Sequence, residues 1–364
     1  MTTHANRSDP QSVQHTLTFA DAQTQAEIYR HLEKLTTAAQ ERTAAYSGLG
    51  AQLWEQLAQR IAGGKLARPG LVMLAFEAFG GQHRRQALDL ACAFELLHNA
   101  LVIHDDIIDR DFVRRGQPTI SALYREKALS CGSSPQDAEH RGNSAALIAG
   151  DLLLSEAIKI AGRAASGLDH ETQIEACFFQ AIEQAGAGEL EDLLYSLYPN
   201  PVTTAEVLHM EELKTAAYSF QLPLQAGALL AGADTLQAQL LGTVGSKLGV
   251  AYQIIDDVLG TFGNPQHTGK PVDSDLREFK NTILLSLASE NADFMSLLHK
   301  FRTGQVPAQA VRQALAAQDA ESFARQLAHQ LCLSATGSAA FLRLPDLAQR
   351  RLQKCTELIL ERSW

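Results

Sequence analysis

Apolar residues recur at three- and four-residue spacing along most of this chain. Such spacing gathers them on one face of an α-helix, which has about 3.6 residues per turn. The signals of strands, short alternating runs of Val, Ile and Thr bounded by Asn-Gly or Asp-Gly turns, are almost absent. The chain is therefore predicted to be all-α. The pattern predicts helices over residues 22–46, 50–62, 69–80, 85–108, 143–163, 169–197, 204–217, 219–231, 235–260 and 275–292, with several shorter ones up to Trp364.

Short segments rich in turn-forming residues separate these helices. The short breaks are Gly63-Gly64, Gly80-Gly81, Tyr198-Pro199-Asn200-Pro201 and Gly263-Asn264-Pro265. One longer polar segment, 127–142, is predicted to be a surface loop, and residues 1–20 are predicted to be a flexible tail. Because neither a repeat nor a dividing linker interrupts the remainder, we expect residues 21–364 to form a single large helical bundle.

Composition narrows the class of protein. Of the 364 residues, 46% are hydrophobic and 20% are charged, which is the balance of a globular chain. No apolar run is long enough to predict a transmembrane helix, and the N-terminus lacks the apolar segment of a secretory signal. The five dispersed cysteines are typical of reduced thiols, so we expect a cytoplasmic location. The net charge of −10 argues against a nucleic-acid partner.

The predicted helix 85–108 runs into a group of aspartates. Asp105 and Asp109 are four residues apart, so both carboxylates project from one helix face, and His98 lies on that face as well. Acidic groups at a helix C-terminus are unfavourable because the helix dipole is negative there, and like charges at this spacing repel. A bound cation would relieve both costs, and oxygen ligands favour Mg²⁺. The alternative interpretation is a solvated acidic helix end.

A second apolar helix, predicted over 235–260, also carries paired aspartates near its end. These are Asp256 and Asp257, and Gln253 lies one turn earlier on nearly the same face. Two such helices are hard to explain as solvent-facing accidents. If they face each other, carboxylates line both walls of a cleft, where several Mg²⁺ ions would hold a diphosphate.

Basic residues accompany these acidic segments. Lys65 and Arg68 follow the Gly63-Gly64 turn at a predicted helix start, where backbone N–H groups also favour anions. Further basic positions stand beside acidic segments or turns: Arg114, Arg115, Lys214, Lys270 and Lys280. Each alone is typical of a solvated surface. Their recurrence indicates an anionic substrate.

Together these segments resemble the trans-polyprenyl (isoprenyl) diphosphate synthase family. The matching blocks, in order, are GGKLARP (63–69), LHNALVIHDDIIDRDFVRRG (97–116), GDLLLSEA (150–157), GELEDLLY (188–195), ELKTAAYSF (212–220) and AYQIIDDVLGTFGNPQHTGKPVDSDLREFKNT (251–282). The DDxxD motif followed by RR is the most specific. The resemblance implies an all-α bundle of the isoprenoid synthase type with a central cleft. It also implies a homodimeric, Mg²⁺-dependent prenyltransferase that condenses isopentenyl diphosphate with allylic prenyl diphosphates.

The resemblance assigns roles to individual residues. The implied Mg²⁺ ligands, for about three ions per site, are Asp105, Asp109 and Asp256, which are catalytic together with Lys214. The implied contacts of isopentenyl diphosphate are Lys65, Arg68, His98 and Arg115. The implied contacts of the allylic diphosphate are Arg114, Lys214, Thr215, Gln253 and Lys270, assisted by Lys280. Asp106 and Asp257 are expected to tune the metal sites. Segments 127–142 and 261–275 are candidate lids that exclude water.

Three positions depart from the family pattern. Gly260 stands where many members have a third aspartate, so metal binding at the second motif is expected to rest on Asp256. Leu66-Ala67 lose one basic residue of the first block, and Phe279 replaces a glycine that often precedes Lys280. None of the three removes a residue that the proposed chemistry requires.

Product length is expected to depend on the apolar side chains below the first motif, Leu97, Ala100 and Leu101. Short-product members of the family often place large aromatics at the last two positions, whereas this chain has small or aliphatic residues there. Geranylgeranyl diphosphate (C20) is therefore the favoured product, with a farnesyl or longer product as the alternative. The same residues are also consistent with an ordinary core.

Two other functions compete with this one. A terpene cyclase shares the helical bundle, but it does not need the isopentenyl site of Lys65, Arg68 and His98, or the pair Asp256-Asp257. A non-catalytic partner subunit of a heteromeric synthase typically loses the metal motifs, and here only Gly260 points that way. A purely structural scaffold leaves both carboxylate clusters unexplained.

Overall fold

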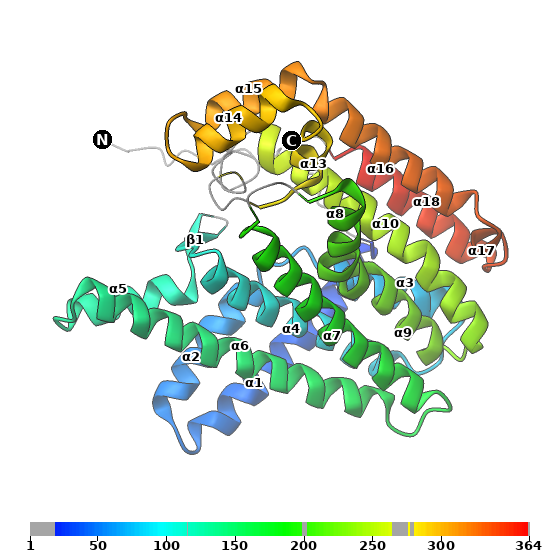
Figure 1. Ribbon diagram of the computed structural model, residues 1–364. Helices are drawn as coiled ribbons and strands as arrows, with labels where there is room; N and C mark the ends of the chain where they lie inside the picture. Colours follow the sequence, from blue (N-terminus) through cyan, green and yellow to red (C-terminus); the bar gives the residue numbers. More distant parts are fainter. Residues whose placement is uncertain (1–18, 115, 199–201, 264–275, 277–279, 363–364) are drawn as a thin grey trace, which may run out of the picture.

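The computed structural model describes residues 19–114, 116–198, 202–263, 276 and 280–362. Helices account for most of them (Figure 1), so the all-α prediction is confirmed. The helices before the second acidic motif are α1 (Ala22–Ala44), α2 (Gly48–Ile61), α3 (Ala67–Ala78), α4 (Arg84–Ile108), α5 (Ile120–Ser130), α6 (Pro135–Ala165), α7 (Glu171–Tyr195), α8 (Thr204–Glu211), the π-helix η1 (Glu212–Gln221) and α9 (Leu222–Leu230). The remaining helices are α10 (Thr235–Phe262), α13 (Ile283–Ala288), α14 (Ala292–Arg302), α15 (Ala308–Ala317), α16 (Ala320–Thr336), α17 (Ala339–Leu342) and α18 (Asp346–Leu360).

The described strands form one short hairpin. β1 (Val113–Arg114) and β2 (Gln117–Pro118) pair antiparallel, with Val113 opposite Pro118 and Arg114 opposite Gln117. This hairpin follows directly on the first acidic motif. It turns the chain back so that Arg114 faces the helix it has just left.

Side-chain caps set the starts of many helices. Asp21 accepts a hydrogen bond from the Thr24 amide at the start of α1, and Asp234 caps α10 in the same way. At α8, Thr203 and Glu206 form a reciprocal capping box. Most predicted helices before residue 264 agree with these bounds to within a few residues, because the apolar period and the caps mark the same ends.

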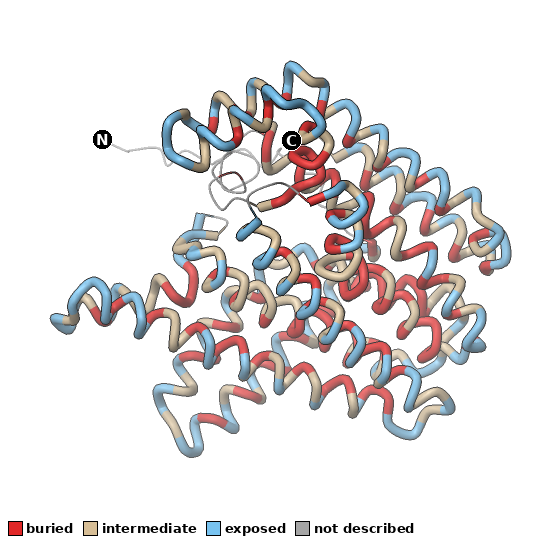
Figure 2. The backbone as a smooth tube through the Cα atoms, viewed as in Figure 1, coloured by how far each residue is buried: buried red, intermediate tan, exposed pale blue. Residues whose placement is uncertain are grey.

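The prediction of a loop over 127–142 is wrong. α5 continues to Ser130 and α6 begins at Pro135, so residues 131–134 alone connect them. The Ser134 hydroxyl caps α6 by accepting from the Asp137 amide, and Pro135 occupies the first turn, where proline is tolerated. The polar composition reflected exposure rather than loss of helix, because α5 and the start of α6 project from the body (Figures 1 and 2). The candidate lid at 127–142 is therefore helical at both ends and its role stays a prediction, and most of the other candidate lid, 264–275, lies outside the described residues.

The centre of the fold is built around α3, α4, α9 and α10. Figure 2 shows that their buried residues form the interior, while outer helices such as α5 and α15 mix buried, intermediate and exposed residues. Among the described helices, α4 has the length and composition of a membrane span, but 67% of its most apolar window is buried inside the protein. That burial is expected for the core helix of a globular protein.

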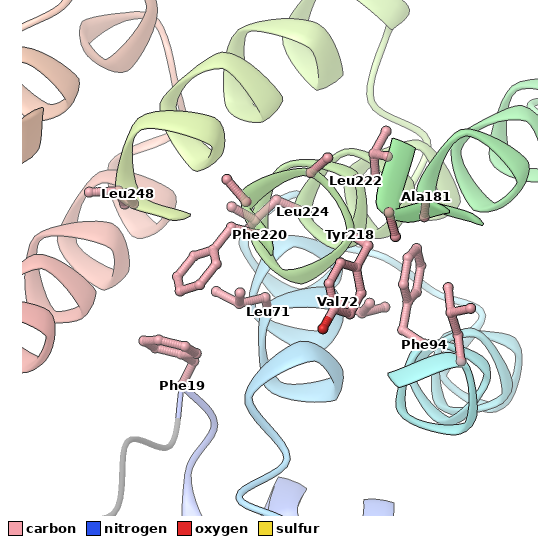
Figure 3. Packing of buried hydrophobic residues seen from close by; sticks show 14 of the residues in the cluster. Phe19, Leu71, Val72, Phe94, Ala181, Tyr218, Phe220, Leu222, Leu224 and Leu248 are labelled. Carbon is pink, nitrogen blue, oxygen red and sulfur yellow. The ribbon is translucent and has the colours of Figure 1, made fainter. Parts of the chain in front are cut away.

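Aromatic contacts join the central helices to one another and to their neighbours. The ring of Phe220 in η1 packs edge-on against the ring of Phe19, with the two centroids 5.6 Å apart. Its centroid lies 5.3 Å from that of the Tyr252 ring in α10. Phe94 of α4 makes an edge-to-face contact with Phe178 of α7 at 5.1 Å. Figure 3 shows Phe94 and Tyr218 on the same side of this cluster, near Val72 of α3. Such pairs add specificity to apolar burial and hold α4, α7, η1 and α10 in one arrangement.

Candidate functional site

The first acidic motif lies at the C-terminal end of α4. Asp105 and Asp106 are in its last turn, and Asp109 caps the helix by donating its amide to the Asp105 carbonyl at 2.8 Å. The next residue, Arg110, has φ 58°, a left-handed conformation that costs energy for a residue with a side chain. Such strained positions concentrate at functional sites. This turn sends the chain into the β1–β2 hairpin.

Arg114 of β1 reaches back over the motif. Its guanidinium lies 2.9 Å from Asp105 and 2.5 Å from Asp106, and it also approaches Asp111 at 3.6 Å. Burial raises the pKa of Asp106 to about 6, even though Arg114 acts in the opposite direction. Arg114, which was predicted to contact the substrate, therefore serves as a counter-ion of the first motif.

Lys214 joins three helices at the same place. Its ammonium lies 2.6 Å from Asp192 and 3.0 Å from Glu189, both on α7, and 3.7 Å from Asp105 on α4. Burial opposes the charged form, but Asp192 and Asp105 outweigh it and raise the pKa of Lys214. Lys214 and its half-buried neighbour Thr215 belong to η1, and π-helical turns often mark functional sites.

The close approach of α7 to η1 depends on Gly188. A Cβ at this position would lie 2.3 Å from the Lys214 amide nitrogen, closer than real Cβ contacts. Glu189 and Asp192 follow Gly188 on the same helix, so the glycine brings their carboxylates to Lys214. The sequence interpretation had quoted the block GELEDLLY without giving Glu189 or Asp192 a role. The signal for this role in the sequence was the pair Glu189 and Asp192, three positions apart, which follows Gly188.

A short segment after the second motif joins the two motifs. The Lys280 ammonium lies 2.5 Å from the Asp109 carboxylate of the first motif. Three residues later, the Ile283 amide donates to Asp257 of the second motif at 3.4 Å. Three residues of extended chain span at most about 10 Å. The two motifs therefore lie on either side of one short segment, and facing helices were the condition that the sequence interpretation had set for a shared cleft.

The two aspartates of the second motif differ in their surroundings. Asp257 is buried on α10, accepts a hydrogen bond from Gln253 at 2.8 Å, and lies beside the buried carboxyl of Glu211. Burial, and then the Asp257 charge, raise the pKa of Glu211 well above its usual range. Asp256 is more exposed and forms a 2.6 Å ion pair with Arg362, which follows α18. Sequence reasoning missed both Glu211 and Arg362, because neither lies in a matching block.

Two of the residues predicted to bind isopentenyl diphosphate, Arg68 and His98, meet through Tyr218. Arg68 of α3 donates to the Tyr218 hydroxyl at 2.9 Å and to the Ser219 hydroxyl at 2.7 Å. The same Tyr218 hydroxyl lies 3.3 Å from Nδ1 of His98 on α4. Lys65 is exposed just before Leu66, which starts α3 in a left-handed conformation with φ 53°. Tyr218 and Ser219 lie in the block ELKTAAYSF, but the sequence interpretation gave them no role.

Other predicted positions are less informative. Arg115, Lys270 and Phe279 lie outside the described residues. Gly260 is half-buried on α10, four residues after Asp256. Of the predicted chain-length residues, Leu97 and Ala100 are buried in the core and Leu101 is partly buried. Deeper along α4 stands the Phe94–Phe178 pair.

The donor chemistry of this arrangement fits a hard divalent cation. Among the described residues, no three His, Cys, Asp or Glu side chains converge closely enough to hold a metal ion by themselves. Instead, the carboxylates of Asp105, Asp109 and Asp256 each pair with a lysine or arginine. Carboxylates that attract cationic groups in this way offer the oxygen ligands that Mg²⁺ prefers, and Mg²⁺ commonly completes its shell with substrate phosphates and water.

Facing aspartate motifs on two helices of an all-α fold define the isoprenoid synthase class. The sequence model of the Polyprenyl synthetase family matches residues 51–317, so this chain belongs to that family.

Named relatives and a solved structure agree with this assignment. The chain is 37% identical over 225 residues to a geranylgeranyl diphosphate synthase of Sulfolobus acidocaldarius, covering 61% of this chain and 62% of that protein. It is also 37% identical over 235 residues to a geranylfarnesyl diphosphate synthase of Aeropyrum pernix, covering 64% and 68% of the two chains. The match thus spans about three fifths of the length of the first relative.

The fold is similar to the crystal structure of a geranylgeranyl pyrophosphate synthase from Corynebacterium glutamicum complexed with isoprenyl diphosphate and magnesium. The TM-score is 0.85 at 26% identity, and the alignment covers 94% of this chain and 99% of that one.

Proposed function

We propose that this protein is a prenyltransferase that condenses isopentenyl diphosphate with allylic diphosphates, head to tail (1′–4), to give a trans-polyprenyl diphosphate. The observation that carries the proposal is the segment 280–283, where Lys280 contacts Asp109 and the Ile283 amide contacts Asp257. This segment contacts the first motif through a lysine and the second through a backbone amide, which supports a shared site. A diphosphate with bound cations matches that charge pattern.

The residues at the two motifs have distinct tasks in this proposal. Asp105, Asp109 and Asp256 would hold about three Mg²⁺ ions, which, when bound, neutralise charge on the departing diphosphate. Arg114, Lys214 and Lys280 would move from their carboxylate partners to the oxygens of the allylic diphosphate. Their donors stand close to the motif already, so binding exchanges one set of anions for another at little cost in reorganisation.

Bond formation needs no strong side-chain base. The allylic carbon–oxygen bond breaks to leave a resonance-stabilised cation, and the isopentenyl double bond attacks its first carbon. A proton then leaves, with the released diphosphate as its acceptor. Arg68 and His98, held together through Tyr218, would orient isopentenyl diphosphate, with Lys65 at the neighbouring turn.

For the product we favour geranylgeranyl diphosphate. Ala100 and Leu101 are small or aliphatic where a large aromatic would occupy more space, and the Phe94–Phe178 pair lies deeper along α4. Relatives named for geranylgeranyl and geranylfarnesyl products support a chain beyond C15. A farnesyl product is the alternative, and mass analysis of the products decides between them.

We also propose a cytoplasmic homodimer. The exposed faces of α6 and α7 carry large apolar side chains that water solvates poorly: Leu147, Ile148, Phe179, Leu190 and Leu194. A second copy of the chain would cover them in a two-fold contact. Sedimentation of the purified protein should give twice the mass of one chain, and a monomer at micromolar concentration would contradict this.

The test of the activity uses the purified full-length chain. It is incubated with Mg²⁺, isopentenyl diphosphate and either dimethylallyl, geranyl or farnesyl diphosphate, and the products are separated by mass. We expect chains extended by five-carbon units, no product in EDTA, and a loss of about a hundredfold or more in kcat for Asp105→Asn. Glu126→Gln, an exposed change on α5, is the matched control.

Two outcomes would favour the competing functions. A cyclised hydrocarbon formed from one primer alone would indicate a terpene cyclase. Folded protein without turnover of any primer would indicate a non-catalytic partner subunit.

A further inference from the structure

The end of α18 lies near the second acidic motif. Arg362 stands two residues after the end of α18 at Leu360, and its side chain is 15% exposed. Its Nη2 atom lies 2.6 Å from Oδ1 of Asp256. The guanidinium also stacks over the Tyr252 ring, 4.4 Å from the centroid, one turn earlier on α10. Arg362 is therefore held both by charge and by an aromatic face.

The surroundings favour the charged form of Arg362. Burial lowers its pKa, but the carboxylate of Asp256 outweighs burial and the net direction is upward. One guanidinium nitrogen, Nη1, is buried without a hydrogen-bond partner among the described residues. A buried donor left unsatisfied costs free energy, so this contact does not use the full donor capacity of the arginine.

The helix that carries Arg362 is anchored independently of the site. Arg351 of α18 forms a 2.6 Å ion pair with Glu77 of α3, and α18 also packs on α10 and α16. Release of Arg362 from Asp256 would therefore leave this anchor of α18 in place. The other counter-ions of the motifs, Arg114, Lys214 and Lys280, belong to segments inside the family blocks, whereas Arg362 belongs to none of them.

We propose that Arg362 is an internal counter-ion of Asp256 that a divalent cation displaces when it binds the second motif. This inference rests on the proposed role of Asp256 as a metal ligand. The guanidinium and the metal compete for the same carboxylate, so each weakens the other by the same factor. Arg362 thereby becomes coupled to the metal content of the site, although it contributes no ligand itself.

The first test measures metal affinity without turnover. Mn²⁺ is titrated, in the presence of inorganic pyrophosphate, into the full-length protein and its variants, and free Mn²⁺ is followed by electron paramagnetic resonance. Arg362→Gln should bind Mn²⁺ about tenfold more tightly, because the competing charge is gone. Arg350→Gln removes the same charge from an exposed position on α18 and should match the wild type.

A mutant cycle isolates the pair. In an Asp256→Asn background, Arg362→Gln should no longer change Mn²⁺ affinity, because the shared carboxylate is absent. Unchanged or weaker Mn²⁺ binding by Arg362→Gln in the otherwise wild-type protein would overturn the proposal. Arg362→Lys keeps the charge but loses the stacking on Tyr252, so its Mn²⁺ affinity should lie between those of Arg362→Gln and the wild type. Thermal unfolding verifies that each variant is folded.

A second readout follows the end of the chain. The sequence has two tryptophans, Trp54 in α2 and Trp364 two residues after Arg362. In a Trp54→Phe background, Mn²⁺ with pyrophosphate should change the fluorescence of Trp364, and Asp256→Asn should abolish that change. No change with bound Mn²⁺ would contradict displacement.

The two proposals fail in different ways. Absence of elongated product with intact Mn²⁺ coupling would remove the proposed activity and leave the Arg362 contact in place. Normal elongation, with the same Mn²⁺ affinity in Arg362→Gln as in the wild type, would support the proposed activity and overturn the role of Arg362. Equal Mn²⁺ affinity of Asp256→Asn and wild type would overturn the metal role of Asp256 on which this inference depends.

Discussion

Lys280 lies 2.5 Å from Asp109, although 171 residues separate them in the chain. The contact closes the space between α4 and the segment that follows α10. Burial, and then the charge of Asp105, raise the pKa of Asp109, while Lys280 and Lys214 lower it. The first motif thus holds more negative charge than it can keep without nearby cations. This imbalance is the physical basis of the metal and diphosphate binding proposed here.

Gly188 is expected to be intolerant of any side chain. Gly188→Ala would put a Cβ 2.3 Å from the Lys214 amide nitrogen, so α7 and η1 must separate and Glu189 must leave Lys214. We expect a loss of about 2–4 kcal/mol of stability and a fall of about tenfold in kcat. Urea unfolding and steady-state kinetics measure the two effects.

Gly186 provides the control, because a Cβ there meets nothing within 4 Å. Gly186→Ala, on the same helix, should stabilise the protein by about 0.5–1 kcal/mol, since alanine favours helix. Equal effects of the two substitutions would contradict the packing argument.

Tyr218 is expected to position the isopentenyl site rather than the allylic one. Tyr218→Phe removes the hydroxyl that accepts from Arg68 and contacts His98. We expect KM for isopentenyl diphosphate to rise about fivefold, with kcat and the allylic KM nearly unchanged. Tyr46→Phe, at a residue that is 80% exposed, is the control. An equal rise in both KM values would show that the tyrosine supports the whole site instead.

Asp89 is expected to contribute stability that depends on pH. It is buried on α4 and accepts from His31 at 2.7 Å and from Arg163 at 2.8 Å. Burial raises its pKa, but these two partners outweigh burial and the net direction is downward. The folded state therefore binds fewer protons than the unfolded state in acid, so this contribution is present above about pH 4 and lost as pH falls through the folded pKa.

The matching experiment compares unfolding at two pH values. Asp89→Asn should lower the free energy of unfolding by about 2 kcal/mol at pH 7, and by clearly less at pH 3. Asp169→Asn, at an exposed position, should have little effect at either pH. A gap between Asp89→Asn and the wild type that stays constant with pH would contradict the ion-pair origin.

Ala100 is expected to limit product length when enlarged. The residue is 1% exposed and lies five residues before Asp105 on α4. Ala100→Phe should shorten the longest product by about one five-carbon unit or more, at a cost of about 1–3 kcal/mol in stability from overpacking. Ala317→Phe, at an exposed position on α15, should leave the product unchanged. An unaltered product from folded Ala100→Phe would place the length limit elsewhere.

The sequence by itself determined the helical class and much of the candidate site. The apolar period located α1 to α4 and α10, because one buried face per helix leaves a regular trace in the chain. Asp105, Asp109 and Asp256 stood out because acidic groups at the ends of apolar helices are costly without a cation. The spacing of apolar residues did not identify the start of α6, because the polar residues of an exposed helix resemble those of a loop.

Only the tertiary structure decided which charges meet. Arg362 reaches Asp256 from beyond the matching blocks, and Glu211 lies against Asp257, contacts that no local spacing encodes. The need for glycine at position 188 is evident only from the packing of η1 against α7, which leaves no space for a Cβ. The spacing of apolar residues indicates which face of a helix is buried. Which residue of another helix contacts that face depends on how segments distant in the sequence pack.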